Sequence, residues 1–160
     1  MHRYDLIDEA VLDAEPGAVW DALVAELNGA ARWWTPKNTF RPGAAPPERP
    51  GGEMHVGVHP NGAGRPGPVL RFTARTTAAV PGERLAFDYV DGVFRGRAAI
   101  TLTDVGGGRT RIAMHFVAEP AGWVRVLAKV KDVGLEHSKG TQEAFANLNA
   151  LLARTPAVVS

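Results

Sequence analysis

Two side chains in this sequence, His137 and Tyr89, are suited to acid–base chemistry. An imidazole changes charge near neutral pH, so His137 could serve as a general base or orient a carbonyl or phenol group. The hydroxyl of Tyr89 could donate a hydrogen bond beside it. Each residue also has a structural explanation, because a histidine at a helix break can bond to backbone carbonyls and a buried tyrosine needs a hydroxyl partner in any protein. Both are therefore catalytic candidates, and the fold must decide between the two explanations.

A second set of polar residues, Glu53, His55 and His59, occupies alternate positions of one strand-like run. Histidine and carboxylate side chains are ligands that zinc accepts. The intervening residues are apolar and form the set that we expect to face inward: Met54, Val56 and Val58. The histidines then point to solvent, and with no further ligand nearby we expect no metal site. The chain has no cysteine, which excludes disulfides and thiolate ligands, and we expect no cofactor.

The elements that position these residues begin with a strand over 3–13 and a short amphipathic helix over 14–28. A proline in its first turn and a closing Asn-Gly pair are typical of helix ends. Four apolar residues at helical spacing indicate its buried face: Val19, Trp20, Leu23 and Leu27. We expect one further helical turn over 30–34 (AARWW), which stops before Pro36 because the residue ahead of a proline avoids helical backbone angles.

The adjacent tryptophans Trp33 and Trp34 pose a packing problem. Neighbouring side chains point about 100° apart on a helix and to opposite faces on a strand, so two such rings do not share one core pocket. Burial of each ring is worth roughly 4–6 kcal/mol, from about 150–250 Å² of surface. We therefore expect either two separate apolar surfaces or a role outside the core for one of the two rings.

Residues 41–52 (RPGAAPPERPGG) are rich in proline and glycine and predict a loop without regular structure. Strand-like runs separated by turn sequences follow it: 53–59, 69–77, 85–90, 93–104 and 110–119. Apolar and polar residues alternate along each run. This alternation is typical of an antiparallel sheet that is covered on one face only.

The segment 121–154 is predicted to supply that cover. Its apolar and small residues recur every three or four positions and form one helical stripe: Trp123, Leu127, Val130, Gly134, His137, Thr141, Phe145, Leu148 and Leu152. The stripe directs His137 toward the sheet. Gly134 and Gly140 each weaken a helix by about 1 kcal/mol relative to alanine, so we expect a kink or short break near 134–140.

The bulk composition is that of one globular domain over residues 1–160, with 45% hydrophobic residues and a formal net charge of +1. The lysines and arginines are scattered, so we expect no nucleic acid partner. The N-terminus lacks an apolar signal core, and no apolar run approaches the roughly 20 residues of a membrane span. We expect a cytoplasmic protein without membrane insertion, as a monomer or a homodimer.

The order of these elements resembles the helix-grip fold of the SRPBCC superfamily, which includes START lipid-binding domains, birch-pollen-type allergens and polyketide cyclase/dehydrase proteins. The resemblance spans nearly the whole chain. Its carriers are VLDAEPGAVWDAL, ARWW, the pair VDGVFRGRAAITLTD and GGGRTRIAMHF, and the closing AFANLNALLAR. The first of these is similar to the family's "A-P-x-x-V-W" entry into the first helix, with one extra residue before the proline.

The resemblance implies an α+β helix-grip fold, in which a curved antiparallel sheet of about six or seven strands wraps around the long C-terminal helix, with two short helices after strand 1. It also implies an elongated apolar cavity between sheet and helix. Small residues on the inward faces would leave space there: Ala74, Gly96, Ala98 and Gly134. The residues expected to bind a ligand are Trp34, Val56, Phe72, Phe87, Tyr89, Phe94, Met114, Phe116, Leu127, Val130 and His137.

The implied function is binding of a small, mainly hydrophobic molecule of the polyketide, aromatic, lipid or terpenoid class. An alternative is a polyketide cyclase/dehydrase-type enzyme with His137 and Tyr89 as its acid and base. A second alternative is a protein-interaction or chaperone-regulator module. That alternative predicts a filled interior and an exposed apolar patch around the 41–52 loop.

Overall fold

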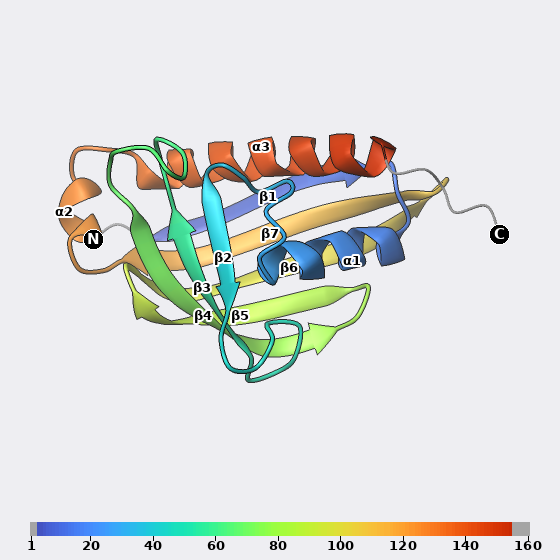
Figure 1. Ribbon diagram of the computed structural model, residues 1–160, viewed down its shortest axis with the longest axis horizontal. Helices are drawn as coiled ribbons and strands as arrows, with labels where there is room; N and C mark the ends of the chain where they lie inside the picture. Colours follow the sequence, from blue (N-terminus) through green and yellow to red (C-terminus); the bar gives the residue numbers. More distant parts are fainter. Residues whose placement is uncertain (1–2, 155–160) are drawn as a thin grey trace.

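The computed structural model describes residues 3–154, which form seven strands and three helices (Figure 1). In chain order the elements are β1 (Tyr4–Leu12), α1 (Pro16–Leu27), β2 (Asn38–Pro42), β3 (Glu53–Val58), β4 (Leu70–Val80), β5 (Arg84–Gly92), β6 (Phe94–Gly106), β7 (Arg109–Pro120), α2 (Val124–Leu127) and α3 (Val133–Arg154). The first strand and the five strands predicted after the proline-rich loop are all present.

The seven strands form one antiparallel sheet in the order β1-β7-β6-β5-β4-β3-β2. The chain meanders from β2 to β7, and β7 pairs with the first strand, as in Leu6 opposite Phe116. Register shifts in the β4–β5 and β6–β7 pairs mark bulges, which bend strands. The sheet curls around α3, which lies across its concave side (Figure 1). This arrangement confirms the predicted α+β helix-grip fold, with seven strands.

The segment between α1 and β3 differs from the prediction. The helical turn expected over 30–34 is absent, because residues 32–37 form bends and turns instead. Residues 38–42 form β2, which was not expected, with Phe40 opposite Val56 of β3. The loop prediction for 41–52 is therefore wrong at its first two residues. Pro42 is tolerated because β2 is an edge strand, where a missing N–H costs no ladder bond.

The C-terminal cover is interrupted earlier than the sequence predicts. Turns and a bend occupy 128–131, and α3 then runs unbroken from Val133 through both of its glycines, so the expected break at 134–140 is wrong. The side chain of Asp132 explains the restart, since its Oδ1 accepts the N–H of Leu135 at 2.9 Å as a helix cap does. The interruption also shifts the helical phase, so that Trp123 and Val130 face solvent.

Three of the four small residues on the inward faces have roles other than the one expected. A Cβ on Gly134 would lie 2.8 Å from Cδ1 of Tyr4, so this glycine permits close packing of α3 on β1. A Cβ on Gly96 would lie 2.2 Å from the carbonyl oxygen of Val117, and its φ of 135° suits glycine. Ala74 is buried in the core. Ala98 is the one of the four that borders open space inside the protein.

Polar contacts with β1 fix α3 along one edge of the sheet. Asp8, a buried carboxylate on β1, accepts hydrogen bonds from Ser138 Oγ at 3.0 Å and Gln142 Nε2 at 3.4 Å. At the end of β1, Asn149 Oδ1 accepts the backbone N–H of Asp13 at 2.9 Å. These hydrogen bonds attach α3 to the β1 edge of the sheet. They do not involve β2 and β3, which lie at the opposite edge.

The two glycines of α3 make a matched pair for testing this attachment. A Cβ on Gly140 would meet no other part of the protein within 4 Å, so Gly140→Ala should stabilise the protein by about 0.5–1 kcal/mol through helix propensity. Gly134→Ala gains the same propensity but must displace Tyr4, so we expect it to destabilise the protein by about 1–2 kcal/mol. Urea denaturation measures both values, and equal stabilisation by the two alanines would contradict the close packing of α3 on β1.

Candidate ligand-binding cavity

An internal cavity of about 350 Å³ lies between the sheet and α3. Its volume falls in the range of about 300–1,000 Å³ that is usual for small-molecule sites. Most of the predicted ligand-binding residues line it: Trp34, Val56, Phe72, Phe87, Tyr89, Phe94, Met114, Phe116, Leu127 and His137. The exception is Val130, which is 85% exposed because the chain turns at 128–131 before α3 begins.

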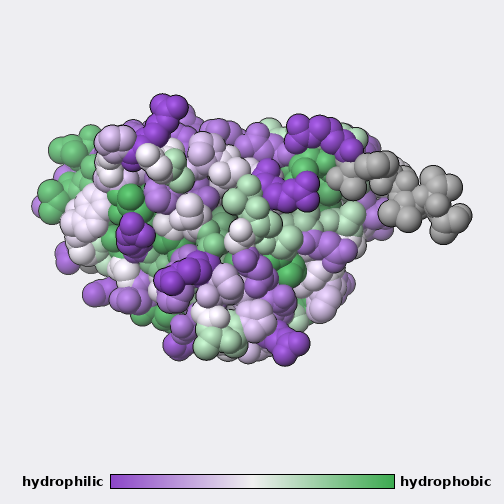
Figure 2. Space-filling view, in the orientation of Figure 1, coloured by the Kyte–Doolittle hydropathy of each residue, from purple (hydrophilic) through white to green (hydrophobic). Residues whose placement is uncertain are grey.

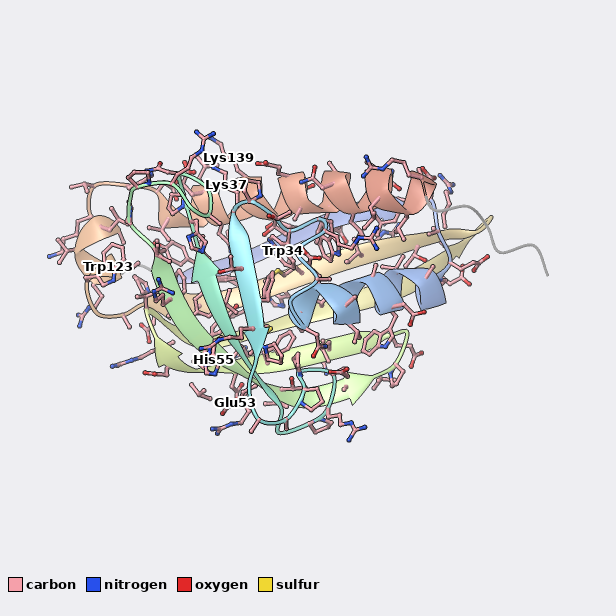
Figure 3. The ribbon with its side chains drawn as sticks, viewed as in Figure 1. Trp34, Lys37, Glu53, His55, Trp123 and Lys139 are labelled. Atoms are coloured by element: carbon pink, nitrogen blue, oxygen red, sulfur yellow. The ribbon has the colours of Figure 1, made fainter. Side chains whose placement is uncertain are left out.

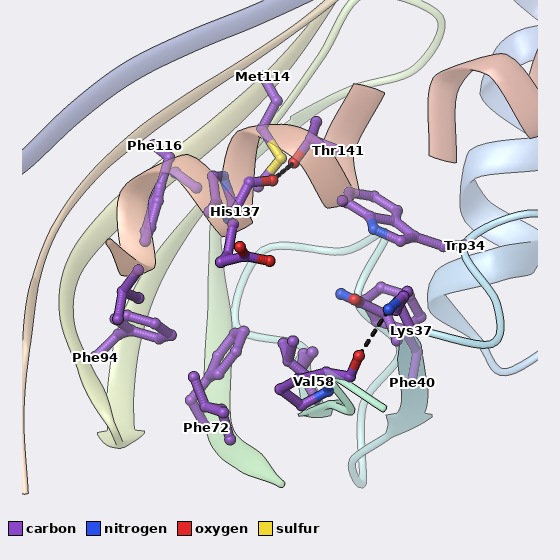
Figure 4. Close-up of a pocket in the computed structure, with 18 of the residues that line it drawn as sticks. Trp34, Lys37, Phe40, Val58, Phe72, Phe94, Met114, Phe116, His137 and Thr141 are labelled. Carbon is purple, nitrogen blue, oxygen red and sulfur yellow. Dashed lines mark hydrogen bonds between the residues drawn. The ribbon is translucent and has the colours of Figure 1, made fainter. Parts of the chain in front are cut away.

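Aromatic rings build one wall of the cavity. They come from β4, β5, β6 and β7 as Phe72, Tyr89, Phe94 and Phe116, and their ring centroids are 5.2–6.4 Å apart. Most of these pairs meet edge to face, which is a favourable geometry for aromatic rings (Figure 4). The rings hold each other in place, so this wall is rigid and apolar.

His137 brings a polar group to this apolar wall. It lies on α3 with its ring 4.0 Å from the ring of Phe116, centroid to centroid (Figure 4). Its Nε2 is buried and has no hydrogen-bond partner among the described residues. Burial lowers the pKa of His137 to about 4, against a smaller opposing effect of the Asp8 carboxylate. The imidazole is therefore neutral at pH 7, with one nitrogen able to donate and the other able to accept.

Tyr89 is the second polar group of the cavity wall. Burial raises the pKa of its hydroxyl far above the ordinary value of 10.0, so the hydroxyl stays protonated. Its ring lies 5.9 Å from that of Phe116, the same ring that contacts His137. No hydrogen bond joins Tyr89 to His137 among the described residues. The structure thus brings the two catalytic candidates to one cavity without coupling them to each other.

The mouth of the cavity carries charged residues that the sequence did not single out. Lys37 and Asn38 lie on one side, and charged side chains of α3 and the turn before it lie on the other: Lys131, Glu136, Lys139 and Glu143. Figure 3 labels Lys37, in the turn before β2, and Lys139, on α3. Lys37 is half-buried and donates from Nζ to the carbonyl of Pro60 at 2.6 Å (Figure 4). Within residues 3–154 none of the mouth lysines forms an ion pair.

A buried carboxylate places Trp34 at the cavity. Glu26 is 1% exposed and accepts backbone N–H bonds from Arg32 at 2.9 Å, Trp33 at 3.1 Å and Trp34 at 2.8 Å. The resulting bend lets consecutive side chains lie together, and the two tryptophan rings stack with centroids 5.2 Å apart. The expectation that the two rings point apart is wrong, because the segment is neither helix nor strand. Trp33 is buried in the core, and Trp34 lines the cavity.

Sequence reasoning missed Glu26 because a glutamate on an amphipathic helix is ordinarily exposed. The available signal was its place on the same face as Val19, Leu23 and Leu27, in the last turn of the helix. A carboxylate there can satisfy the free N–H groups of the chain that follows. The mouth lysines carried no local signal, since only the folded chain brings them to one cavity.

His55 of β3 and His59, the residue after β3, each contact a threonine and not a metal site. His55 Nδ1 lies 3.0 Å from Thr73 Oγ1, and His59 Nε2 lies 3.0 Å from Thr39 Oγ1. Glu53 pairs with Arg75 at 2.7 Å on the exposed side of the sheet. In the described part of the chain, no three histidine or acidic side chains come together as a metal site would require.

Comparison with known proteins agrees with this geometry. The family model described as "Polyketide cyclase / dehydrase and lipid transport" matches residues 7–152. Among solved structures, a START superfamily protein from Mycobacterium smegmatis has a TM-score of 0.70 at 11% identity, covering 94% of this chain and 97% of the other. A protein from Thermus thermophilus has a TM-score of 0.69 at 17% identity, covering 95% and 100% of the two chains.

A third similar structure, from Chromobacterium violaceum, has a TM-score of 0.62 at 21% identity and covers 92% of this chain and 96% of the other. These structural likenesses concern the fold. The comparison with curated proteins gives no match.

The role of Glu26 can be tested by substitution. Glu26→Ala leaves three N–H groups without their acceptor, and we expect it to cost about 3–5 kcal/mol of unfolding free energy. Glu26→Gln keeps one side-chain oxygen and should cost less. Near-ultraviolet circular dichroism reports the stacked tryptophans, and it should lose intensity in the alanine variant at a denaturant concentration where the helices persist. An unchanged spectrum and stability would show that Glu26 does not hold the turn.

The neutral state of His137 makes stability depend on pH. The pKa is lowered in the folded protein to about 4 from 6.5, so between these values the unfolded chain binds the extra proton and the folded state loses stability as the pH falls. We expect the wild type to lose up to roughly 3 kcal/mol between pH 7 and pH 4 relative to His137→Leu. Urea titrations of both proteins across this range measure the difference, and parallel pH profiles would contradict the burial of a neutral imidazole.

Proposed function

Because the chain belongs to the polyketide cyclase/dehydrase and lipid transport family, we propose that it binds a small, mainly hydrophobic molecule in the cavity between its sheet and α3. The observation that carries the proposal is a cavity of about 350 Å³ with apolar walls and one unpartnered polar atom, Nε2 of His137. The ligand is of the polyketide, aromatic, lipid or terpenoid class. Its apolar surface supplies the affinity, and His137 fixes its orientation.

The orphaned nitrogen supports a ligand with a polar group. A buried donor or acceptor without a partner costs about 1–3 kcal/mol, so an empty site leaves the protein with a penalty that a bound hydroxyl or carbonyl removes. The imidazole is neutral at pH 7, so it suits a neutral partner better than a carboxylate. The hydroxyl of Tyr89, protonated and without a hydrogen bond among the described residues, offers a second donor. The ligand is thus an apolar molecule with one or two hydroxyl or carbonyl groups.

The edge-to-face aromatic wall favours a flat ligand. Phe72, Phe94 and Phe116 are held by one another, so they present fixed surfaces against which a second ring can pack. Trp34 lies in the turn after α1 and faces the cavity across from these three rings (Figure 4). The aromatic wall and Trp34 both favour a ligand with an aromatic or polycyclic ring system.

A cyclase or dehydrase is the second candidate function. A cavity that holds a reactive chain in a folded conformation can accelerate its cyclisation by positioning alone. His137 is unprotonated at pH 7 and so in the correct state to accept a proton, yet a pKa of about 4 makes it a weak base. If His137 is nevertheless the base for a polyketide substrate, His137→Gln lowers turnover by about 10²–10⁴. Binding is the better supported function because it needs only the polarity of the imidazole.

The interaction-module alternative has less support. The interior is not filled, and the 41–52 loop bonds to the rest of the protein through Thr76, whose hydroxyl donates to the carbonyl of Pro47 at 2.5 Å. None of the large hydrophobic residues that are exposed in the described chain lies in that loop.

A hydroxylated ligand and its hydrocarbon analogue test the role of His137. We expect 2-naphthol to bind the wild type more tightly than naphthalene does. His137→Leu removes the hydrogen bond and should weaken 2-naphthol binding about three- to tenfold, while naphthalene binding stays within a factor of about two. Calorimetry measures both affinities, and quenching of the tryptophan fluorescence gives a second measurement. Equal losses for the two compounds would contradict a hydrogen bond at Nε2.

Filling the cavity tests whether the compounds bind there at all. Ala98→Leu adds bulk to the cavity wall, whereas Arg97→Leu places the same side chain on the exposed face of β6, one residue away. We expect Ala98→Leu to weaken binding of both compounds at least tenfold and Arg97→Leu to leave it unchanged, with circular dichroism verifying that each variant is folded. Unchanged binding by the Ala98→Leu variant would place the ligand elsewhere.

A further inference from the structure

The segment 123–135, which we call the α2 segment, exposes an unusual amount of apolar surface. Eight large hydrophobic side chains are exposed in the described chain, and four of them lie here: Trp123 (47%), Val126 (66%), Val130 (85%) and Leu135 (50%). The other four are scattered over three strands. Figure 2 shows hydrophobic atoms gathered at the end of the molecule that α2 occupies, and Figure 3 shows Trp123 at that end.

The α2 segment is apolar on two sides. Val124 and Ala128 are buried and pack in the core cluster that contains Phe94 and Phe116. Trp123, Val126 and Val130 recur at helical spacing and lie on the opposite, solvent-facing side. A helical segment that is hydrophobic on all sides is ordinarily buried on all sides. The inner side has its partner within the protein, and the outer side has none among the described residues.

Cations surround these exposed apolar residues. Arg125, Lys129 and Lys131 are exposed, and within the described chain none of them forms an ion pair. Asp132 is the one acidic residue between Trp123 and Leu135, and its carboxylate is engaged in capping α3. Three basic residues against one acidic residue leave the segment with a net charge of +2. Its partner must therefore offer both apolar surface and negative charge.

We propose that the α2 segment docks the protein onto the surface of an anionic lipid bilayer. A bilayer presents anionic headgroups above an apolar layer, which matches basic residues alternating with valine and leucine. The indole of a tryptophan prefers this boundary, where its ring is apolar and its N–H is hydrated. A protein partner would match a flatter apolar patch with fewer cations. The docking is peripheral, since no helix in residues 3–154 is long and apolar enough to cross a membrane.

The α2 segment borders the cavity, so docking would assist the exchange of a ligand with the bilayer. Leu127, Lys131 and Val133 belong to it, and all three line the cavity. Docking would bring the mouth close to the acyl chains, so an apolar ligand could exchange without crossing water. This use rests on the proposed ligand-binding function, whereas the docking itself rests only on the exposed surface.

Trp123 supplies a direct readout. Of the four tryptophans, Trp20, Trp33 and Trp34 are at most 9% exposed, and Trp123 is 47% exposed. We expect the emission of the ligand-free protein to shift to shorter wavelength with vesicles of phosphatidylcholine and phosphatidylglycerol, and to change little with phosphatidylcholine alone. The protein should co-sediment with the anionic vesicles, and raising the salt concentration from about 0.05 to about 0.5 M should weaken binding, as ionic screening requires.

Two double substitutions separate the apolar and electrostatic contributions. The double variant Val126→Asp, Val130→Asp should reduce vesicle binding at least tenfold. The double variant Arg125→Glu, Lys129→Glu should reduce it about 25-fold or more, because each cation removed weakens binding roughly fivefold. Val80→Asp with Val90→Asp changes equally apolar residues, 44% and 41% exposed on the strands, and should bind vesicles as the wild type does. None of these residues lines the cavity.

The measurements distinguish failure of docking from failure of ligand binding. Absence of vesicle binding, while 2-naphthol still binds, would overturn the membrane proposal and leave the proposed function intact. A mass that rises with protein concentration and falls in the Val126→Asp, Val130→Asp variant would also overturn it, because a second copy of the chain would then cover the segment. If both docking and ligand binding hold, the same variant should keep its ligand affinity but transfer a bound ligand to anionic vesicles several-fold more slowly than the wild type.

Discussion

One long helix cannot cover the concave face of a seven-stranded sheet, and the interior of this protein follows from that constraint. Glycine at 134 and the polar contacts of Asp8 attach α3 along β1, at one edge of the sheet. α1 and the buried core residues that pack with it fill another part of the concave face. Between α3 and the strands β3 to β7, side chains line the surface without filling the space, and a cavity of about 350 Å³ remains. Its mouth opens where β2 and the chain around Lys37 stand apart from α3.

The polar groups inside this framework fall into two kinds. Glu26 and Asp8 are buried carboxylates that accept several hydrogen bonds, so they fix the turn that carries Trp34 and the helix that carries His137. The buried Nε2 of His137 has no hydrogen-bond partner among the described residues. Native interiors rarely leave a buried polar atom unpaired. Because the structural carboxylates are satisfied and this nitrogen is not, the nitrogen is available to a ligand.

The sequence predicted most of the sheet and the cavity lining, because alternation along a strand is a local property that decides which side chains face inward. It failed where the chain leaves regular structure. The stacking of Trp33 on Trp34 needs a bend that neither helix nor strand periodicity describes, and the bend depends on a glutamate seven and eight residues earlier. Val130 was misplaced because Asp132 restarts the helix in a new phase. Lys37 and Lys139 come to line the same cavity only through tertiary structure.

A crystal structure of the protein with 6-bromo-2-naphthol tests the central claim most directly, because anomalous scattering locates the bromine independently of the rest of the ligand. We predict one bromine site inside the cavity between Trp34 and the aromatic wall, with the naphthol oxygen within about 3.2 Å of Nε2 of His137. A cavity closed by its own side chains, or a naphthol bound only on the outer surface, would contradict the account.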